Sequence, residues 1–213
     1  EIRVIVNSET VDDDMTFILC KKISEKIREE LFLAGIKLIK EHGIQKTTVD
    51  KLTRSCGIAK GSFYLFYSSK EEYLYALMQY VNEKTEGMIQ RKLAGRTQMT
   101  AKEFFELFRE YLFSDYDLMN SIDIDDFLWM KQHMKEYHLF DPSRQKDQLK
   151  QWLTLICDVR PDVDYGTVVN LMKSIYAMWT FRETFVQASF ENSVQMILKT
   201  LEAYVTGNEL SLL

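Results

Sequence analysis

The 213-residue chain has few of the residues that interrupt regular structure, with only 2 Pro and 8 Gly. This scarcity favours long helices over sandwiches or barrels. The 3 Cys are widely spaced and form no CxxC pair, which argues against a disulfide framework or a zinc site and favours a reducing cytoplasm. No apolar run approaches the roughly 20 residues that a membrane span needs, and no secretory signal is evident. We therefore expect a cytoplasmic all-α protein without a membrane partner.

Catalytic and metal-binding patterns are also scarce. No set of nucleophile, base and orienting residue stands out, so we expect no enzymatic activity. Asp123, Asp125, Asp126 and His133 suggest a metal site, but they match no recognised ligand motif. We expect neither a metal nor a cofactor.

The distribution of charge is more informative than its sum. A formal net charge of −5 by itself argues against DNA binding. Residues 21–70, however, contain eleven basic and five acidic residues, a net charge of +6, which leaves −11 for the rest of the chain. A basic segment joined to an acidic body is expected when only one part meets phosphate, although an ordinary solvated helical surface gives the same count.

Residues 22–57 predict two helices. Apolar residues at helical spacing predict a helix that begins near Lys22 and ends at Gly43. A short helix comes next and ends at Gly57, and Thr47 and Asp50 have the spacing of a capping box at its start. Residues 1–20 differ in composition from the rest of the chain, and we expect them to be an N-terminal extension that is disordered or not native.

Two more helices come closely after these. The stretch "AKGSFYLFY" predicts a short helix, and a longer helix should run to Leu93, capped either by Ser68 with Glu71 or by Ser69 with Glu72. Two short helices joined by a tight glycine turn form a helix-turn-helix, whose second helix can lie in the major groove of DNA.

The residues of this second helix suit close contact with DNA. Gly61 has no side chain and Ser62 a small one, so the helix can approach base edges. Lys60 can reach a phosphate or a guanine edge, and the Tyr64 hydroxyl can meet a phosphate. Lys70, at the start of the next helix, can bind a phosphate together with the helix N-terminal amides. Four apolar residues are expected in the core of the unit: Val49, Leu52, Phe63 and Leu65.

The rest of the chain predicts further helices near 100–113, 121–138, 144–157, 163–190 and 193–206. Apolar positions on the last two exceed what one buried face needs, which favours a dimer through them. Large aromatic and methionine side chains can enclose an apolar pocket for a small molecule. The candidate lining residues are Phe104, Phe108, Tyr111, Phe127, Met130, His133, Trp152, Met172, Tyr176 and Trp179.

Two segments resemble the tetracycline-repressor (TetR) family of bacterial transcription regulators. They are "R-x-x-L-F-x-A-G-I-x-L-I-x-x-x-G" from Arg28 to Gly43 and "TTVDKLTRSCGIAKGSFYLFYSSKEEYL" at 47–74. The resemblance implies an all-α homodimer, with a helix-turn-helix DNA-binding domain at 21–70 and an effector-binding and dimerisation domain at 71–213. It assigns recognition-helix roles to Lys60, Gly61, Ser62 and Tyr64, and phosphate-positioning roles to Thr48 and Lys70.

The chain departs from the family pattern at three positions. Ala59 stands where Ser or Thr is frequent, which weakens the cap of the recognition helix. Phe66 replaces His or Tyr and removes their hydrogen bond. Tyr67 replaces Phe, and we expect its hydroxyl at the surface.

These observations predict a ligand-responsive repressor that binds a palindromic double-stranded DNA operator as a homodimer. A small apolar or aromatic effector would release it. The alternative is a helical ligand-binding or interaction protein without operator binding.

Overall fold

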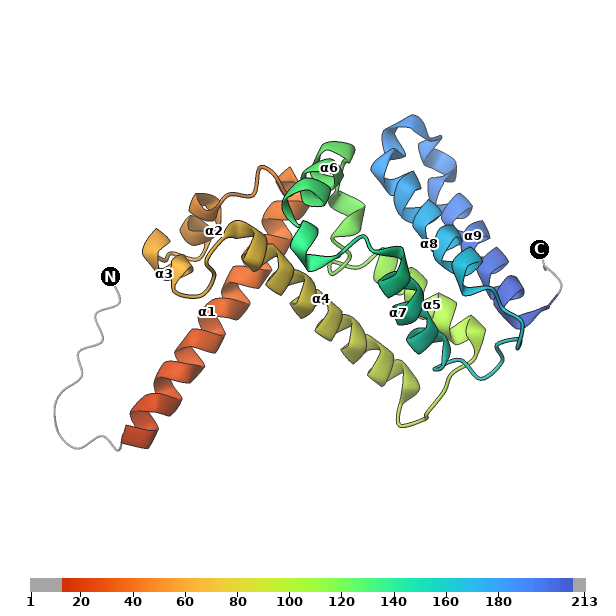
Figure 1. The fold of residues 1–213 in the computed structure, drawn as a ribbon, viewed down its shortest axis with the longest axis horizontal. Coiled ribbons are helices and arrows are strands. Elements are labelled where there is room, and N and C mark those ends of the chain that lie inside the picture. The colour runs from red at the N-terminus through yellow and green to blue at the C-terminus, as the bar shows by residue number, and fades with distance from the viewer. Residues whose placement is uncertain (1–12, 209–213) are drawn as a thin grey trace.

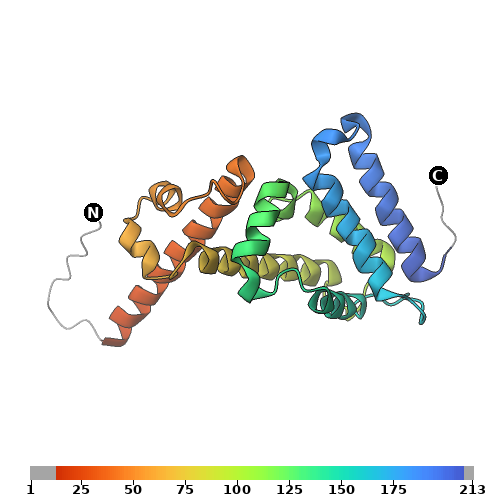
Figure 2. The same ribbon diagram turned by 45° about the horizontal axis from the view of Figure 1, so that its top comes forward.

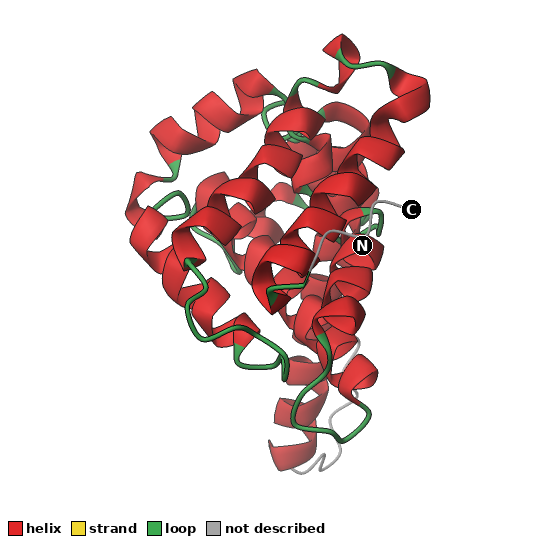
Figure 3. Cartoon of the chain, turned by 90° about the vertical axis from the view of Figure 1, so that its right-hand side faces the viewer, coloured by secondary structure: helices red, strands yellow, loops and turns green. Residues whose placement is uncertain are grey.

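A computed structural model describes the backbone of residues 13–208 and the side chains from residue 21 on. This part of the chain is all-α and contains no strand (Figures 1 and 3). None of its helices is long and apolar enough to cross a membrane. The α-helices are α1 (Asp13–His42), α2 (Val49–Ser55), α3 (Lys60–Tyr64), α4 (Lys70–Leu93), α5 (Ala101–Leu112), α6 (Ile124–His133), α7 (Pro142–Leu153), α8 (Tyr165–Thr180) and α9 (Phe190–Thr206). Short 3-10 turns lie at Met119–Ser121, Lys135–Tyr137, Arg182–Thr184 and Gln187–Ser189.

Helix α1 begins earlier than the sequence pattern predicts. It starts at Asp13, whereas a start near Lys22 was expected, so residues 13–20 are part of the helix. The change in composition near residue 20 introduces no Gly or Pro, and so it does not interrupt a helix. The remainder of the predicted extension, residues 1–12, lies outside the described residues. At its other end α1 stops as expected, because Gly43 takes the left-handed conformation with φ 82°.

The first four helices share one apolar cluster, in which α4 crosses close to α1. The hydroxyl of Tyr73 on α4 donates a 2.7 Å hydrogen bond to the Leu31 carbonyl of α1. A Cβ at Gly35 would collide with this hydroxyl, so the close approach of the two helices requires a glycine there. The buried centre of the cluster includes Leu31, Ile39, Ile44, Leu52, Phe63, Tyr73, Leu74 and Leu77.

Helices α5, α7, α8 and α9 form a second cluster, whereas α6 packs in the first through Met130. Within the second cluster α5 packs against α4 and α9 (Figure 2). Helices α8 and α9 lie side by side, and α7 packs on α8. Helix α4 belongs to both clusters, since Leu74 and Leu77 pack in the first and Ile89 and Leu93 in the second. The apolar packing therefore continues across residue 70, where the sequence analysis divided the chain.

Two predicted segments of the second half are too long. The helix expected at 121–138 covers only Ile124–His133, because Met134 leaves helical geometry with φ −114° and ψ 27°. The helix expected at 163–190 ends at Thr180 and is followed by two 3-10 turns. Every residue from 181 to 189 is exposed, so no burial holds that stretch in a long helix.

Candidate DNA-binding surface and cavity

Helices α2 and α3 form the predicted helix-turn-helix. The hydroxyl of Thr48 caps α2 by accepting a 3.3 Å hydrogen bond from the Lys51 amide, so the cap is Thr48 and not Thr47. Thr47 is buried, and its hydroxyl donates to the Gly43 carbonyl at 2.8 Å. The turn between the helices contains Gly57 with φ 65°, a conformation that favours glycine.

Helix α3 begins at Lys60 and is succeeded by α4, as the sequence suggests. Ala59 caps α3 without a side-chain hydrogen bond, as expected of a residue with no polar atom in its side chain. Of the two caps considered for α4, the structure has Ser69, which accepts a 3.1 Å hydrogen bond from the Glu72 amide. The Tyr67 hydroxyl was expected at the surface, and this prediction is wrong. Tyr67 is only 6% exposed and packs in the first cluster.

Several residues at the end of the unit face solvent together. Lys60, Gly61 and Tyr64 are exposed, and Phe63 is fully buried on the opposite side. A Cβ at Gly61 would meet no atom within 4 Å. Leu65 was expected in the core but is 84% exposed. The reason is geometric, because side chains two positions apart in a helix point about 200° away from each other. Since the Phe63 side chain points into the core, the Leu65 side chain points outward.

The Lys60 ammonium forms an ion pair with a neighbouring helix. Its Nζ lies 3.0 Å from Oδ1 of Asp50 on α2, and both side chains are more than half exposed. The hydrogen bond to this carboxylate raises the pKa of Lys60. The ammonium is therefore charged and held at the edge of α3, and any phosphate that it meets competes with Asp50.

Lys70 does not stand free at the start of α4. Its Nζ donates hydrogen bonds to the carbonyls of Ile44 at 2.7 Å and Gln45 at 3.1 Å, and lies 4.7 Å from the centre of the Trp129 ring. Burial lowers its pKa. The carbonyls just beyond the end of α1 provide the acceptors that draw the ammonium inward, so its phosphate-positioning role would require it to leave them.

Asp126 on α6 binds the backbone amides of the same turn, residues 43–45. Its two carboxylate oxygens accept hydrogen bonds from the Ile44 and Gln45 amides, each at 2.8 Å, and the residue is 3% exposed. A Cβ at Gly43 would collide with this carboxylate. We call the contacts of the 43–45 turn with Lys70 and Asp126, together with the packing of Lys70 on Trp129, the junction.

The sequence pattern suggests for Asp126 only the role of a metal ligand. In the described part of the chain no group of three His, Cys, Asp or Glu side chains is placed to hold a metal ion. Asp123, the N-cap of α6, instead accepts a 2.7 Å hydrogen bond from the Asp126 amide. No local signal marks Asp126 as a junction residue, because its partners are 81 and 82 positions away in the sequence.

A mostly apolar cavity of about 750 Å³ lies between α4, α5, α6, α7 and α8. The cavity adjoins the junction at two places. Helix α6, which carries Asp126, forms part of the cavity wall, and the Ile44 side chain forms another part. The α4 wall was not predicted from the sequence, although apolar residues recur every three or four positions from Leu74 to Val81 and again at Met88 and Ile89. Eight of the ten predicted pocket residues line the cavity: Phe104, Phe108, Tyr111, Phe127, Met130, Trp152, Met172 and Tyr176.

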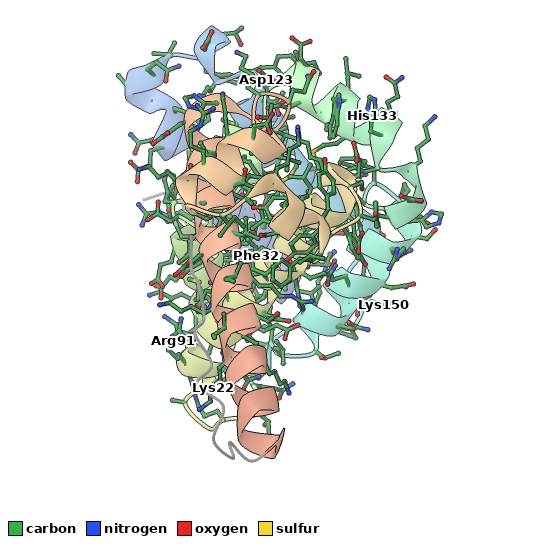
Figure 4. The ribbon with its side chains drawn as sticks, turned by 90° about the vertical axis from the view of Figure 1, so that its left-hand side faces the viewer. Lys22, Phe32, Arg91, Asp123, His133 and Lys150 are labelled. Atoms are coloured by element: carbon green, nitrogen blue, oxygen red, sulfur yellow. The ribbon has the colours of Figure 1, made fainter. Side chains whose placement is uncertain are left out.

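The other two predicted pocket residues lie elsewhere. His133 is exposed at the end of α6, where its ring stacks on Trp129 with 4.6 Å between centroids (Figure 4). Trp179 turns away from the cavity and packs edge-on against Phe113 and Phe190. Each therefore has aromatic neighbours other than the cavity wall.

The cavity contains a few polar groups on its apolar wall. Burial raises the pKa of both Tyr111 and Tyr176, so their hydroxyls stay protonated. The Gln145 side-chain oxygen is buried and accepts no hydrogen bond from the described residues. A large apolar cavity with sparse polar groups is the usual form of a small-molecule site.

Comparisons with known proteins agree with this architecture. Residues 31–77 match the family model "Bacterial regulatory proteins, tetR family". A TetR-family transcriptional regulator of Streptomyces coelicolor superposes with a TM-score of 0.59 at 11% identity, over 85% of this chain and 97% of that one. A TetR-family regulator of Haemophilus influenzae does so with a TM-score of 0.53 at 12% identity, over 86% and 98%.

Curated relatives match over shorter segments. The uncharacterized HTH-type transcriptional regulator YuxN of Bacillus subtilis is 34% identical over 61 residues, which are 28% of this chain and 21% of that protein. Ribonuclease Y of Oleidesulfovibrio alaskensis is 47% identical over 60 residues, 28% of this chain but only 10% of the enzyme. The chain thus matches about a fifth or less of these two relatives' lengths.

The helix-turn-helix, the helical body and these matches define a DNA-binding transcriptional regulator. The chain resembles TetR-family regulators by sequence over residues 31–77 and in its fold over most of its length.

We predict that Gly61→Ala separates DNA binding from folding. The added methyl group meets only solvent, and alanine favours a helix more than glycine does. The free energy of unfolding should therefore stay the same or rise by up to about 1 kcal/mol, and the melting temperature should not fall. Operator affinity should fall by about tenfold, because the added methyl group keeps α3 from the base edges. Thermal unfolding and a gel shift with selected DNA measure the two effects, and unchanged operator affinity would contradict the role of Gly61.

Proposed function

We propose that the protein is a ligand-responsive repressor that binds a palindromic operator as a homodimer and is released by a small, mainly apolar or aromatic effector. The observation that supports this most is the position of α6, which lines the cavity and also holds the turn before the helix-turn-helix. Repression needs no further activity of the chain, since a dimer seated on its operator excludes other proteins from that DNA. The role is regulatory and cytoplasmic, and involves no catalysis.

DNA recognition in this proposal rests on the exposed face of α3. Lys60, Gly61, Ser62 and Tyr64 approach the major groove, and Thr48 positions α2 near a phosphate. Exposed basic side chains on and beside α2 add attraction to the DNA backbone: Lys46, Lys51 and Arg54.

We predict opposite effects for the two members of the Lys60–Asp50 ion pair. Lys60→Ala should weaken operator binding and relax base preference, at a cost of about 1–3 kcal/mol if the ammonium contacts a base. Asp50→Asn should strengthen binding, because it frees Lys60 and removes a negative charge from the same edge. Salt titrations of operator binding measure both, and equal affinities for wild type and both variants would exclude Lys60 from the DNA contact.

The coupling of cavity to DNA runs through the junction. A ligand that fits the cavity better in one position of α6 favours that position, and it does so only by its differential affinity for the two states. Movement of α6 carries Asp126 with it, and the 43–45 turn is bonded to Asp126 through two amides. The start of the helix-turn-helix then moves with the turn, because α2 begins only a few residues further along the chain.

We predict that Asp126→Asn lowers the operator affinity of the effector-free protein about tenfold, which is about 1.4 kcal/mol of binding free energy. An amide group can accept from one of the two backbone N–H groups but presents its own N–H to the other. The matched control is Asp125→Asn, which removes the same charge from the neighbouring residue, whose side chain is exposed.

Effector response is measured on the same variants. Hydrophobic and cationic compounds that raise the wild-type melting temperature should also weaken its operator binding, and should still stabilise Asp126→Asn while changing its affinity less. If Asp126→Asn and Asp125→Asn behave alike, the junction does not couple the two sites.

The proposed dimer forms through the outer faces of α8 and α9. Apolar side chains remain exposed on α9 and on the connection between α8 and α9: Phe181, Phe185, Val186 and Met196, with exposed fractions of 49%, 41%, 73% and 55%. A second copy would bury them and present two helix-turn-helix units to the two halves of a palindrome.

We predict a dimer in sedimentation at micromolar concentration. Met196→Glu on α9 should dissociate it, because the charge would be buried in the interface. Leu128→Glu is the control, since Leu128 is 54% exposed on α6 and outside the proposed interface. A wild-type monomer under these conditions would contradict the dimer.

The alternative function is ligand binding without an operator. This alternative is supported if the full chain enriches no sequence from random double-stranded DNA, while small compounds still raise its melting temperature. The net charge of +6 over residues 21–70 and the exposed α3 face favour operator binding instead.

A further inference from the structure

Leu65 is the most exposed large apolar side chain in the described part of the protein, at 84%. A single exposed leucine needs no explanation on an ordinary surface. This one, however, directly succeeds the helix that is proposed to enter the major groove. Its neighbour Tyr64 is 48% exposed, so the two form a small apolar surface beside Lys60.

The backbone places Leu65 on the DNA-facing side of α3. Leu65 continues the helical turn, with φ −75°, ψ −22° and an amide that donates to the Ser62 carbonyl at 3.3 Å. Its side chain lies one turn beyond Gly61 on the same face, since residues four apart nearly superpose around a helix. Where Gly61 allows close approach to DNA, Leu65 therefore projects toward an adjacent base pair.

The chemistry of the side chain limits what it can contact there. An isobutyl group forms no hydrogen bond with a phosphate or with a polar base edge. The C5-methyl group of thymine is the apolar group that the major groove offers. We infer that Leu65 contacts a thymine methyl and specifies thymine at one position of each operator half-site. The inference rests on the proposed operator binding and adds a specificity-determining residue to it.

The test uses uracil, which differs from thymine only by the missing methyl group. An operator is first selected from random double-stranded DNA with the full wild-type chain, and each thymine is then replaced singly by deoxyuridine. One thymine per half-site should be sensitive, with wild-type affinity falling about fourfold when its methyl is removed. For Leu65→Ala the thymine and uracil operators should bind equally, which is the signature of a direct pairwise contact.

Leu128→Ala is the matched control, because it truncates another exposed leucine on α6, and it should keep the wild-type preference for thymine over uracil. The inference is overturned if no thymine methyl affects wild-type affinity, or if Leu65→Ala keeps the full preference. In both cases wild type still binds its operator, so the proposed function survives. Failure of wild type to select any sequence would overturn operator binding and this inference together.

Discussion

The arrangement of the protein depends on a short turn that is held from both sides. The amides of Ile44 and Gln45 donate to Asp126, and the carbonyls of the same two residues accept from Lys70. A buried carboxylate is costly unless hydrogen bonds compensate it, and these two amides do so. Since Gly43 has no Cβ to collide with Asp126, α1 can end against α6 and direct the chain into α2.

This contact connects the helix-turn-helix to the helical body that contains the cavity. The Ile44 side chain faces the cavity while its backbone is bonded to Asp126 and Lys70, and α6 takes part in both the cavity wall and the junction. Helix α4 provides a second connection, because its first half packs with the helix-turn-helix and its second half with the body. A ligand in the cavity therefore touches elements that also set the position of α2 and α3.

Local signals were enough to predict the helix-turn-helix, because left-handed glycines at 43 and 57 and a serine cap at 69 mark its boundaries. They could not reveal the junction, whose partners lie up to 82 positions apart. Leu65 was misassigned because a five-residue helix contains too few positions to define an apolar period. Eight of the ten predicted pocket residues line the cavity because they are large and apolar, but the α4 wall was not predicted. His133 and Trp179 pack against other aromatic side chains.

Amide hydrogen exchange at Ile44 and Gln45 tests the role of the junction most directly, since the acceptor of both N–H groups is Asp126. The measurement compares the free protein with a complex in which a cavity ligand has weakened operator binding. We expect exchange at both amides to accelerate on ligand binding, while the Arg160 amide, which is bonded to the Val205 carbonyl of α9 and lies outside the cavity lining, keeps its rate. A ligand that releases the operator and leaves both amides as protected as before would contradict coupling through the junction.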